Sequence, residues 1–334
     1  MNKDSEKKMP LSEMNRRDFL VRSAKAGIAI AAVGSLGYLL HDPTGPAAET
    51  EKASLALPDF SIPEAGKKIA VVTGPDRVKT VNTALQSLGG IETFIKKGDR
   101  VLLKVNAAFA SPPALCATTS PELISEVARL CFKVGAASVA VTDNSINNPE
   151  SCFALSGIGE AARSSGAKLI LPQESLFTNI TVPSTKFIRN WPILSGAFQG
   201  ATKLIGIAPV KDHHRSGASM SMKNWYGFVG GRRNIFHQDI HTFIRDLSLM
   251  IKPTLVILDG TLTMISNGPT GGSTADLKKT NTMIVSTDQV AADAAGAVLL
   301  DKKPADLPYI LKAEQAGSGT ADFESLKPIR INVA

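Results

Sequence analysis

Cysteine is scarce in this chain of 334 residues, which has only three: Cys116, Cys131 and Cys152. They are too few and too widely spaced for a disulfide framework, a zinc site or an iron–sulfur cluster. We expect buried apolar cysteines, with a single disulfide as the alternative in an oxidising compartment. The sequence thus predicts that the protein carries no iron–sulfur cluster of its own.

Long runs of lysine and arginine are also missing. The chain holds 37 Lys and Arg against 30 Asp and Glu, a net charge of +7, and the basic residues are spread along it. This distribution argues against nucleic acid as a partner. A hydrophobic fraction of 43% in a chain of this length is sufficient for a large buried core. The mild basic excess is compatible with a local site that binds an anion.

The apolar run from Ala26 to Leu40 is short for a membrane span and rich in Ala and Gly. It follows Arg16-Arg17-Asp18-Phe19-Leu20, which matches the twin-arginine pattern of bacterial export signals. Small residues between Thr44 and Ala48 offer a cleavage site. We therefore predict a twin-arginine signal peptide over residues 1–48 and a linker over residues 49–66.

Such a signal predicts both a partner and a location. The twin-arginine translocase is the expected partner, and the mature protein is expected in the periplasm or elsewhere outside the cytoplasm. Resemblance to these signals implies that the protein crosses the membrane already folded, often with a cofactor inserted. An uncleaved signal is the alternative, and it would then be the protein's one contact with the membrane.

Strand and helix patterns alternate through the rest of the chain. This alternation predicts an α/β fold, with a largely parallel sheet and helices on both faces. No internal linker divides residues 67–334, so we expect a single large domain. The expected strands are Lys68–Thr73, Arg100–Val105, Ser138–Thr142, Lys168–Leu171, Leu204–Val210 and Thr254–Leu258, and the expected helices are Arg77–Leu88, Pro121–Val134, Phe153–Ser164, Phe236–Ile251 and Val290–Leu300.

Polar side chains follow several of these strands, at the edge of a parallel sheet where ligands bind. Lys104 and Asn106 follow one strand and Asp143 and Asn144 a second, while Lys211–His214 follow a third and Asp259-Gly260 a fourth. Ordinary caps and turns would explain the Asn and Asp residues, but lysine is a poor turn former. The set therefore indicates a ligand site.

Residues 211–237 are rich in basic and titratable side chains, and Asp212 is the only acid among them. Basic side chains interspersed with glycines favour an anion such as phosphate or carboxylate. A histidine in this segment would move a proton or bind a metal, with Asp259 to orient it. The residues predicted to bind the ligand are Lys104, Asn106, Lys211, His213, Asn224, Arg233, Asn267 and Gly268, and those predicted to act in catalysis are His214, Lys223, His237 and Asp259.

His237 and His241 lie four residues apart on a predicted helix, so both would face the same side. Two histidines at this spacing can bind a metal ion. Position 238 is Gln where zincins have Glu, so this is no zincin motif. A metal ion at this pair is one hypothesis for a cofactor, and polar residues on a helix face are the alternative.

The segment Asn267–Gly272 is a glycine-rich loop that can present backbone N–H groups to an anion. It lacks the Gly-Lys-Ser/Thr ending of a P-loop. A plain surface turn is the alternative.

Several segments, taken in order, share a pattern with one family. They are Gly98–Asn106, Ala117–Glu122, Lys211–His214, Lys223-Asn224 with Gly227, Phe236-His237, Asp259-Gly260, Asn267–Gly272, and Ser286–Asp288 with Asp293. Together they resemble the bacterial and archaeal domain-of-unknown-function family 362, from about Lys68 to Val333. The resemblance implies little about function. Some members carry ferredoxin-like cysteine motifs, which this chain lacks.

The order His213, Gly217, Lys223, Gly230-Gly231, His237 is also similar to the cofactor region of the lactate racemase nickel-pincer family. In that family a lysine tethers the pincer nucleotide and histidines flank the metal. The resemblance implies Lys223 as the tether and His237 as a ligand or catalytic base. The residues around the lysine depart from that family's pattern.

Two functions stay open at this point. One is an exported enzyme or cofactor-dependent protein with a Lys/His/Asp site for an anion or a metal. The other is a non-catalytic binding protein that captures an anionic ligand or cofactor for an exported redox partner. A purely structural role for these polar residues predicts instead that they lie apart in space.

Overall fold

The structure is a computed structural model that describes residues 16–17, 19–21, 23–27 and 57–333. The described residues between 16 and 27 are helical. The rest of the predicted signal peptide, and residues 49–56 of the predicted linker, lie outside the described residues. In the described part of the chain, no helix combines the length and the apolar character needed to cross a membrane. Residues 57–333 belong to one unit, the single α/β domain that the sequence predicted.

Among the described residues, eight strands form one sheet through this domain, in the order β10-β1-β9-β8-β7-β2-β3-β4. Neighbouring strands are parallel except at β9, which runs antiparallel to both β1 and β8. The prediction of a largely parallel sheet is therefore confirmed. The strands are β1 Ile69–Thr73, β2 Arg100–Lys104, β3 Ser138–Thr142, β4 Lys168–Ile170, β7 Lys203–Lys211, β8 Leu255–Met264, β9 Leu277–Ser286 and β10 Ile329–Asn332, with β5 Thr178–Ile180 and β6 Trp191–Ile193 in a separate two-stranded sheet.

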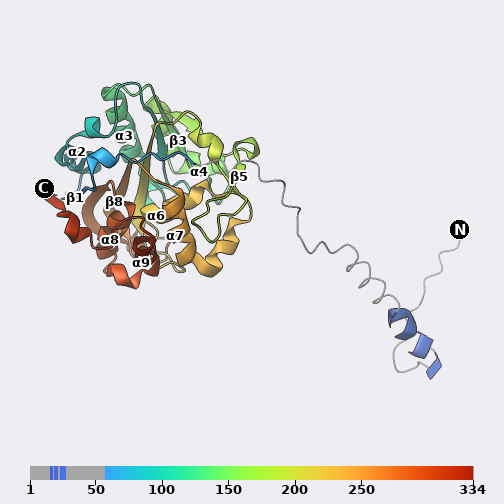
Figure 1. The fold of residues 1–334 in the computed structure, drawn as a ribbon. Coiled ribbons are helices and arrows are strands. Elements are labelled where there is room, and N and C mark those ends of the chain that lie inside the picture. The colour runs from blue at the N-terminus through green and yellow to red at the C-terminus, as the bar shows by residue number, and fades with distance from the viewer. Residues whose placement is uncertain (1–15, 18, 22, 28–56, 334) are drawn as a thin grey trace. The chain divides into compact units, whose positions relative to one another are not determined.

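Helices cover both faces of the sheet, as predicted (Figure 1). Side chains alternate along a strand, so in β2 Leu102 packs into one core while Val101 and Leu103 pack into the other. Helices α2, α3 and α5 contribute to the core of Val101, and α6, α7, α8 and α9 contribute to the core of Leu102. The helices are α2 Arg77–Ser87, α3 Pro121–Lys133, α4 Pro149–Leu155, α5 Ile158–Ser164, α6 Ser221–Asn224, α7 Ile240–Met250, α8 Gln289–Leu299 and α9 Pro308–Gln315.

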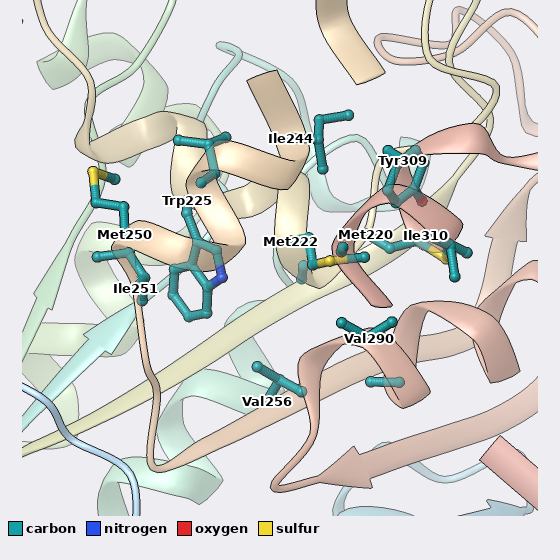
Figure 2. Close-up of a cluster of buried hydrophobic side chains, with 14 of the residues drawn as sticks. Met220, Met222, Trp225, Ile244, Met250, Ile251, Val256, Val290, Tyr309 and Ile310 are labelled. Atoms are coloured by element: carbon teal, nitrogen blue, oxygen red, sulfur yellow. The ribbon is translucent and has the colours of Figure 1, made fainter. Parts of the chain in front are cut away.

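Trp225, directly after α6, fixes that short helix to the sheet. Its side chain is fully buried, and Figure 2 shows it beside Met250 and Ile251. Its Nε1 donates a hydrogen bond to Oε1 of Gln289 at 2.6 Å. A Cβ atom at Gly206 in β7 would lie 2.4 Å from the indole, so the indole packs directly on the backbone of β7. The residues on either side of Trp225 are therefore held close to this strand.

Two predicted helices are interrupted. The helix predicted over Phe153–Ser164 is two helices, α4 and α5, because Gly157 adopts a φ of +73° between them. The helix predicted over Phe236–Ile251 begins only at Ile240. Before it, Arg233–Asp239 form a 3-10 helix, and the backbone of Asp239 (φ −135°, ψ 61°) breaks the helical path.

Strand β8 is longer than predicted. Its pattern predicted an end at Leu258, but the strand continues to Met264. The extension exists because β9 pairs with it on both sides of a bulge between Gly260 and Leu262. Asp259 therefore lies within a strand and not after one. The sequence patterns also missed β9, β10 and α9.

Candidate functional site

A cavity of about 1180 Å³ lies at the carboxyl ends of β2, β3 and β7. This is the edge of the sheet at which the sequence indicated a ligand site. Most of the predicted site residues lie around this one cavity, which argues against a scattered, purely structural set. Its lining includes Asn106, Lys211, His213, His214, Lys223, Asn224, Arg233, His237, Asn267 and Gly268.

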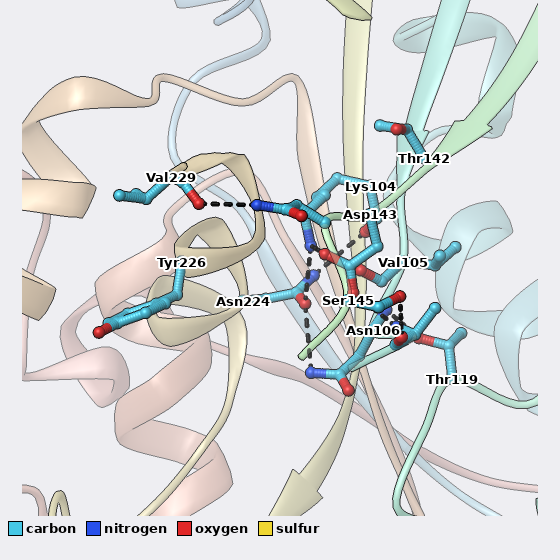
Figure 3. Close-up of polar contacts among 12 residues, drawn as sticks. Lys104, Val105, Asn106, Thr119, Thr142, Asp143, Ser145, Asn224, Tyr226 and Val229 are labelled. Carbon is cyan, nitrogen blue, oxygen red and sulfur yellow. Dashed lines mark hydrogen bonds and ion pairs between the residues drawn. The ribbon is translucent and has the colours of Figure 1, made fainter. Parts of the chain in front are cut away.

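Lys104, the last residue of β2, lies beneath the cavity and outside its lining. Its side chain is fully buried, and Nζ lies 2.7 Å from Oδ1 of Asp143, the residue after β3 (Figure 3). Nζ also donates to the backbone oxygen of Val105 at 2.7 Å and to Oδ1 of Asn224 at 3.3 Å. Burial lowers the pKa of Lys104, and the charge of Asp143 opposes that effect. The ion pair ties the ends of β2 and β3 together.

Gly227 allows the segment after α6 to pass close over this ion pair. A Cβ atom at Gly227 would lie 1.8 Å from Oδ1 of Asp143 and 2.6 Å from Nζ of Lys104. Nδ2 of Asn224 donates to the backbone oxygen of Lys104 at 3.1 Å, and the oxygen of Gly227 accepts from the backbone N–H of Asn144. The spacing of Asn224 and Gly227 in the sequence is thus explained by contact with the Lys104–Asp143 pair.

Two lysines bring positive charge to the cavity without forming an ion pair among the described residues. Nζ of Lys223 also makes no hydrogen bond to any described residue. It lies 5.2 Å from the centre of the Tyr226 ring. Nζ of Lys211 donates to the backbone oxygen of Ala117 at 2.6 Å. Burial and then the charge of Lys223 lower the pKa of Lys211 to about 7. Burial and then the charge of Arg233 lower the pKa of Lys223 to about 7.

Arg233 contributes charge to the cavity but few free donors. Its Nη1 donates to the backbone oxygens of Tyr226 and Val229, each at 3.1 Å. Its Nη2 donates to the backbone oxygens of Asn144 at 2.8 Å and Ser145 at 2.9 Å. Because these bonds go to the backbone, the guanidinium holds the cavity wall together. The sequence predicted that Arg233 binds the ligand directly. With Nη1 and Nη2 bonded to backbone oxygens, Arg233 acts on a ligand mainly through its charge.

His213 is held as a neutral ring with its proton on Nε2. It is almost fully buried, and Nδ1 accepts from the backbone N–H groups of Arg215 at 3.2 Å and Ser216 at 3.3 Å. An accepting Nδ1 leaves the proton of a neutral imidazole on Nε2. Burial, and then the charge of Lys223, lower the pKa of His213 to about 2. Its Nε2–H is therefore a donor suited to an anion and unsuited to a metal.

His214 and His237 have the opposite tautomer. Nδ1 of His214 lies 3.3 Å from the backbone oxygen of Gly268, and Nδ1 of His237 lies 3.2 Å from that of Asn234. A carbonyl oxygen can only accept, so Nδ1 carries a proton in both residues, and the neutral form of either ring has its lone pair on Nε2. Burial lowers the pKa of His237, so its ring is neutral at physiological pH. Both rings stack on His213, at centroid distances of 5.0 and 6.0 Å.

Asp259 lies away from this cavity, contrary to the prediction. Its Oδ2 accepts from Nε of Arg77 at 2.7 Å, and it lines a separate, smaller cavity together with Cys116. It is therefore not placed to orient a histidine of the main cavity. Cys116, Cys131 and Cys152 are all buried and unpaired, as the first of the two sequence interpretations expected.

His241 is also outside the lining of the main cavity. It lies in α7, where its ring stacks on Tyr309 at 6.2 Å. Because Asp239 interrupts the helix, His237 and His241 do not share a helix face, and the structural basis for a metal site at this pair is lost. Among the described residues, no three His, Cys, Asp or Glu side chains gather as metal ligands would.

Asp276, which sequence reasoning missed, holds the glycine-rich loop that also lines the cavity. Its carboxylate accepts from Nδ2 of Asn267 at 2.6 Å, from Oγ of Ser266 at 2.8 Å and from the backbone N–H of Gly272 at 3.1 Å. The sequence does contain a signal for it, because Ser273 and Asp276 form a capping box. Tyr226, which lies between Lys223 and Arg233, was missed as well.

Comparison with known proteins assigns the chain to a family. The model described as "Domain of unknown function (DUF362)" matches residues 101–298. The chain belongs to this family. A thylakoid-associated protein of Synechocystis is 26% identical over 258 residues, which cover 75% of this chain and 78% of that protein. The family resemblance drawn from the sequence is thus confirmed.

Two solved structures are similar in part. The lactate racemase apoprotein from Thermoanaerobacterium thermosaccharolyticum has 13% sequence identity and a TM-score of 0.39, over 73% of this chain and 61% of that one. A protein from Thermotoga maritima has 13% identity and a TM-score of 0.36, over 73% of this chain and 60% of that one. This DUF362 chain spans about three fifths of the length of each. At these TM-scores neither similarity bears on its activity.

Replacing Asp143 by asparagine is expected to destabilise the domain by about 3–5 kcal/mol, because the buried ammonium of Lys104 loses its counter-charge. The double variant Lys104→Met, Asp143→Asn should recover part of that loss, since the unpaired charge is gone. Urea denaturation measures the free energy of unfolding of the single and the double variant.

Glu160→Gln is the control for this comparison. Its ion pair with Arg163 is exposed, so the change should cost less than about 1 kcal/mol. If Asp143→Asn is as stable as the parent protein, the fold does not depend on the buried pair of Lys104 and Asp143.

Proposed function

We propose that this protein is an enzyme that binds a small anionic molecule, with a carboxylate or phosphate group, and moves a proton on it. The observation that supports the proposal is one cavity lined by both unpaired lysines and neutral histidines. Such a cavity favours an anion, because no described carboxylate forms an ion pair with Lys211 or Lys223. A metal cation would be repelled by the same charges.

Each residue then has a role that its contacts suit. Lys211 and Lys223 hold the anion, and the Nε2–H of His213 donates to it. His237 is the proposed base, because its Nε2 has a free lone pair on a neutral ring. His214, with the same tautomer, is the second proton carrier.

Proton transfer is followed as uptake of deuterium from D2O by pyruvate and malonate, two carboxylates with an acidic C–H bond. The parent protein is expected to catalyse this exchange, and His237→Ala is expected to lose it while still binding oxalate. The loss should be about a hundredfold or more, the usual contribution of a positioned base. NMR measures the exchange and calorimetry the binding.

A parent protein that binds oxalate yet catalyses no exchange would contradict the enzyme proposal. That result would favour the alternative, a non-catalytic protein that captures an anionic ligand or cofactor for an exported redox partner. A protein that binds no anion would contradict both.

Binding of oxalate is expected to weaken at least about tenfold as the pH rises from about 6 to about 9, because a charge-assisted hydrogen bond contributes about 1.5–3 kcal/mol. The pKa values of Lys211 and Lys223 lie at about 7, so both lysines are protonated below that pH and lose their charge above it. Oxalate keeps a constant charge over this range. Titration calorimetry at several pH values measures the effect.

Lys223→Gln should bind oxalate more weakly at pH 6 and show a flatter dependence on pH. Lys168→Gln, a change to an exposed lysine in β4, should match the parent. Affinity that is independent of pH in the parent would argue against the two lysines as the anion's partners.

We propose further that the protein is exported, on the strength of the residues Arg16-Arg17-Asp18-Phe19-Leu20. The full chain with Arg16→Lys and Arg17→Lys is expected to stay in the cytoplasmic fraction of a bacterium that has the twin-arginine translocase, whereas the parent reaches the periplasm. Lys7→Gln with Lys8→Gln is the matched control and should be exported. Normal export of the double-lysine variant would refute this part of the proposal.

A further inference from the structure

Lys223 shares the ring of Tyr226 with a second cation, Arg233, which anion binding alone does not require. Nζ of Lys223 lies 5.2 Å from the centre of the Tyr226 ring, and Cζ of Arg233 lies 5.7 Å from the same centre. Two cations near one ring repel each other, and no described carboxylate forms an ion pair with either of them. Burial and then the charge of Arg233 thus lower the pKa of Lys223 to about 7, so its neutral amine is available near neutral pH.

Of the two lysines at this cavity, Lys211 is the one whose ammonium form is better stabilised. Its Nζ donates to the backbone oxygen of Ala117 at 2.6 Å, whereas Lys223 has no hydrogen-bond acceptor among the described residues. Both pKa values lie at about 7, and burial and then the charge of Lys223 lower that of Lys211. Near neutral pH the pair therefore favours a state with one charge, in which Lys211 is the ammonium and Lys223 the amine.

We propose that Lys223 is a nucleophile that forms an imine with the carbonyl carbon of a small oxo acid. This inference rests on the proposed function, since the same cavity must hold the acid's anionic group. Lys211 and the Nε2–H of His213 hold that group, and Lys223 meets the carbonyl. A desolvated lysine beside another cation is a known arrangement for Schiff-base chemistry, because it supplies the amine at neutral pH.

The reaction balances without any further reactant. The lone pair of Nζ forms a bond to the carbonyl carbon, and the π electrons of the carbonyl move to its oxygen. Nε2 of His237 takes a proton from the nitrogen and gives it to that oxygen. The hydroxyl group then leaves as water with the second proton of the nitrogen, while the C=N bond forms. One amine and one carbonyl thus give one imine and one water, with no oxidation or reduction.

His237 is electrostatically coupled to this nitrogen. The charge of Lys223 is the second cause, after burial, of the lowered pKa of His237. Both side chains line the same cavity, and Tyr226 contacts each of them. The neutral ring of His237 can therefore accept a proton from Nζ of Lys223 and pass it to the carbonyl oxygen of the oxo acid.

Trapping with sodium borohydride tests the proposal. The full-length protein is mixed with pyruvate or glyoxylate, treated with borohydride, and examined by intact mass spectrometry and peptide mapping. We expect one adduct per chain, located on Lys223, with the mass of the probe less one oxygen atom. The yield should rise as the pH increases through 7, because the amine form is then more populated.

Lys223→Arg is the matched variant. It places a guanidinium where the parent has the nucleophilic amine, so it should give no adduct. Lys168→Arg, a change in an exposed lysine of β4, should give the full adduct. Circular dichroism verifies the fold of each variant. If Lys223→Arg fails to fold, the peptide map of the parent decides the question.

The outcomes separate this inference from the proposed function. A parent protein that binds oxalate but forms no adduct would overturn the imine and leave the anion site standing. A parent that binds no oxalate would overturn both. An adduct of equal yield in the parent and in Lys223→Arg would also overturn the inference, because other lysines would then be its source.

Discussion

The cavity depends on the buried ion pair between Lys104 and Asp143. This pair joins the carboxyl ends of β2 and β3, and the space above it admits only a glycine at position 227. The segment after α6 therefore passes close over the strand ends, and Asn224 binds it to the backbone of Lys104. Lys223, next to Asn224 in α6, reaches the cavity from this helix. The contacts around this ion pair thus determine where the functional side chains lie.

The second physical feature is an imbalance of charge in the cavity. Its two carboxylates are already engaged, because Asp143 pairs with Lys104 and Asp276 accepts hydrogen bonds from its own loop. No described carboxylate forms an ion pair with Lys211 or Lys223, while burial lowers the pKa values of His213 and His237 and keeps both rings neutral. An anion is therefore the complementary ligand, and neutral imidazoles add the capacity to move a proton.

The sequence predicted the parallel sheet and the edge that carries the site, because both follow from local patterns. Lys104 and Asp143 stand at the ends of short apolar strands, which hydrophobic runs reveal. Asp259 was misplaced because the true end of its strand depends on pairing with β9, which the pattern of β8 cannot show. His241 was misplaced because the backbone at Asp239 breaks a helix that the pattern predicted as continuous. The histidine tautomers depend on contacts with backbone groups, whose positions no sequence motif reveals.

We propose that Lys223 helps to bind an anion in this cavity. Crystals grown with selenate, measured at the selenium absorption edge, test it most directly, since selenate is an anion that can be located by its anomalous signal. We expect an anomalous peak within hydrogen-bond distance of Nζ of Lys223, and no peak there in crystals of Lys223→Gln. Peaks confined to the outer surface of the protein, with the cavity free of selenate, would contradict it.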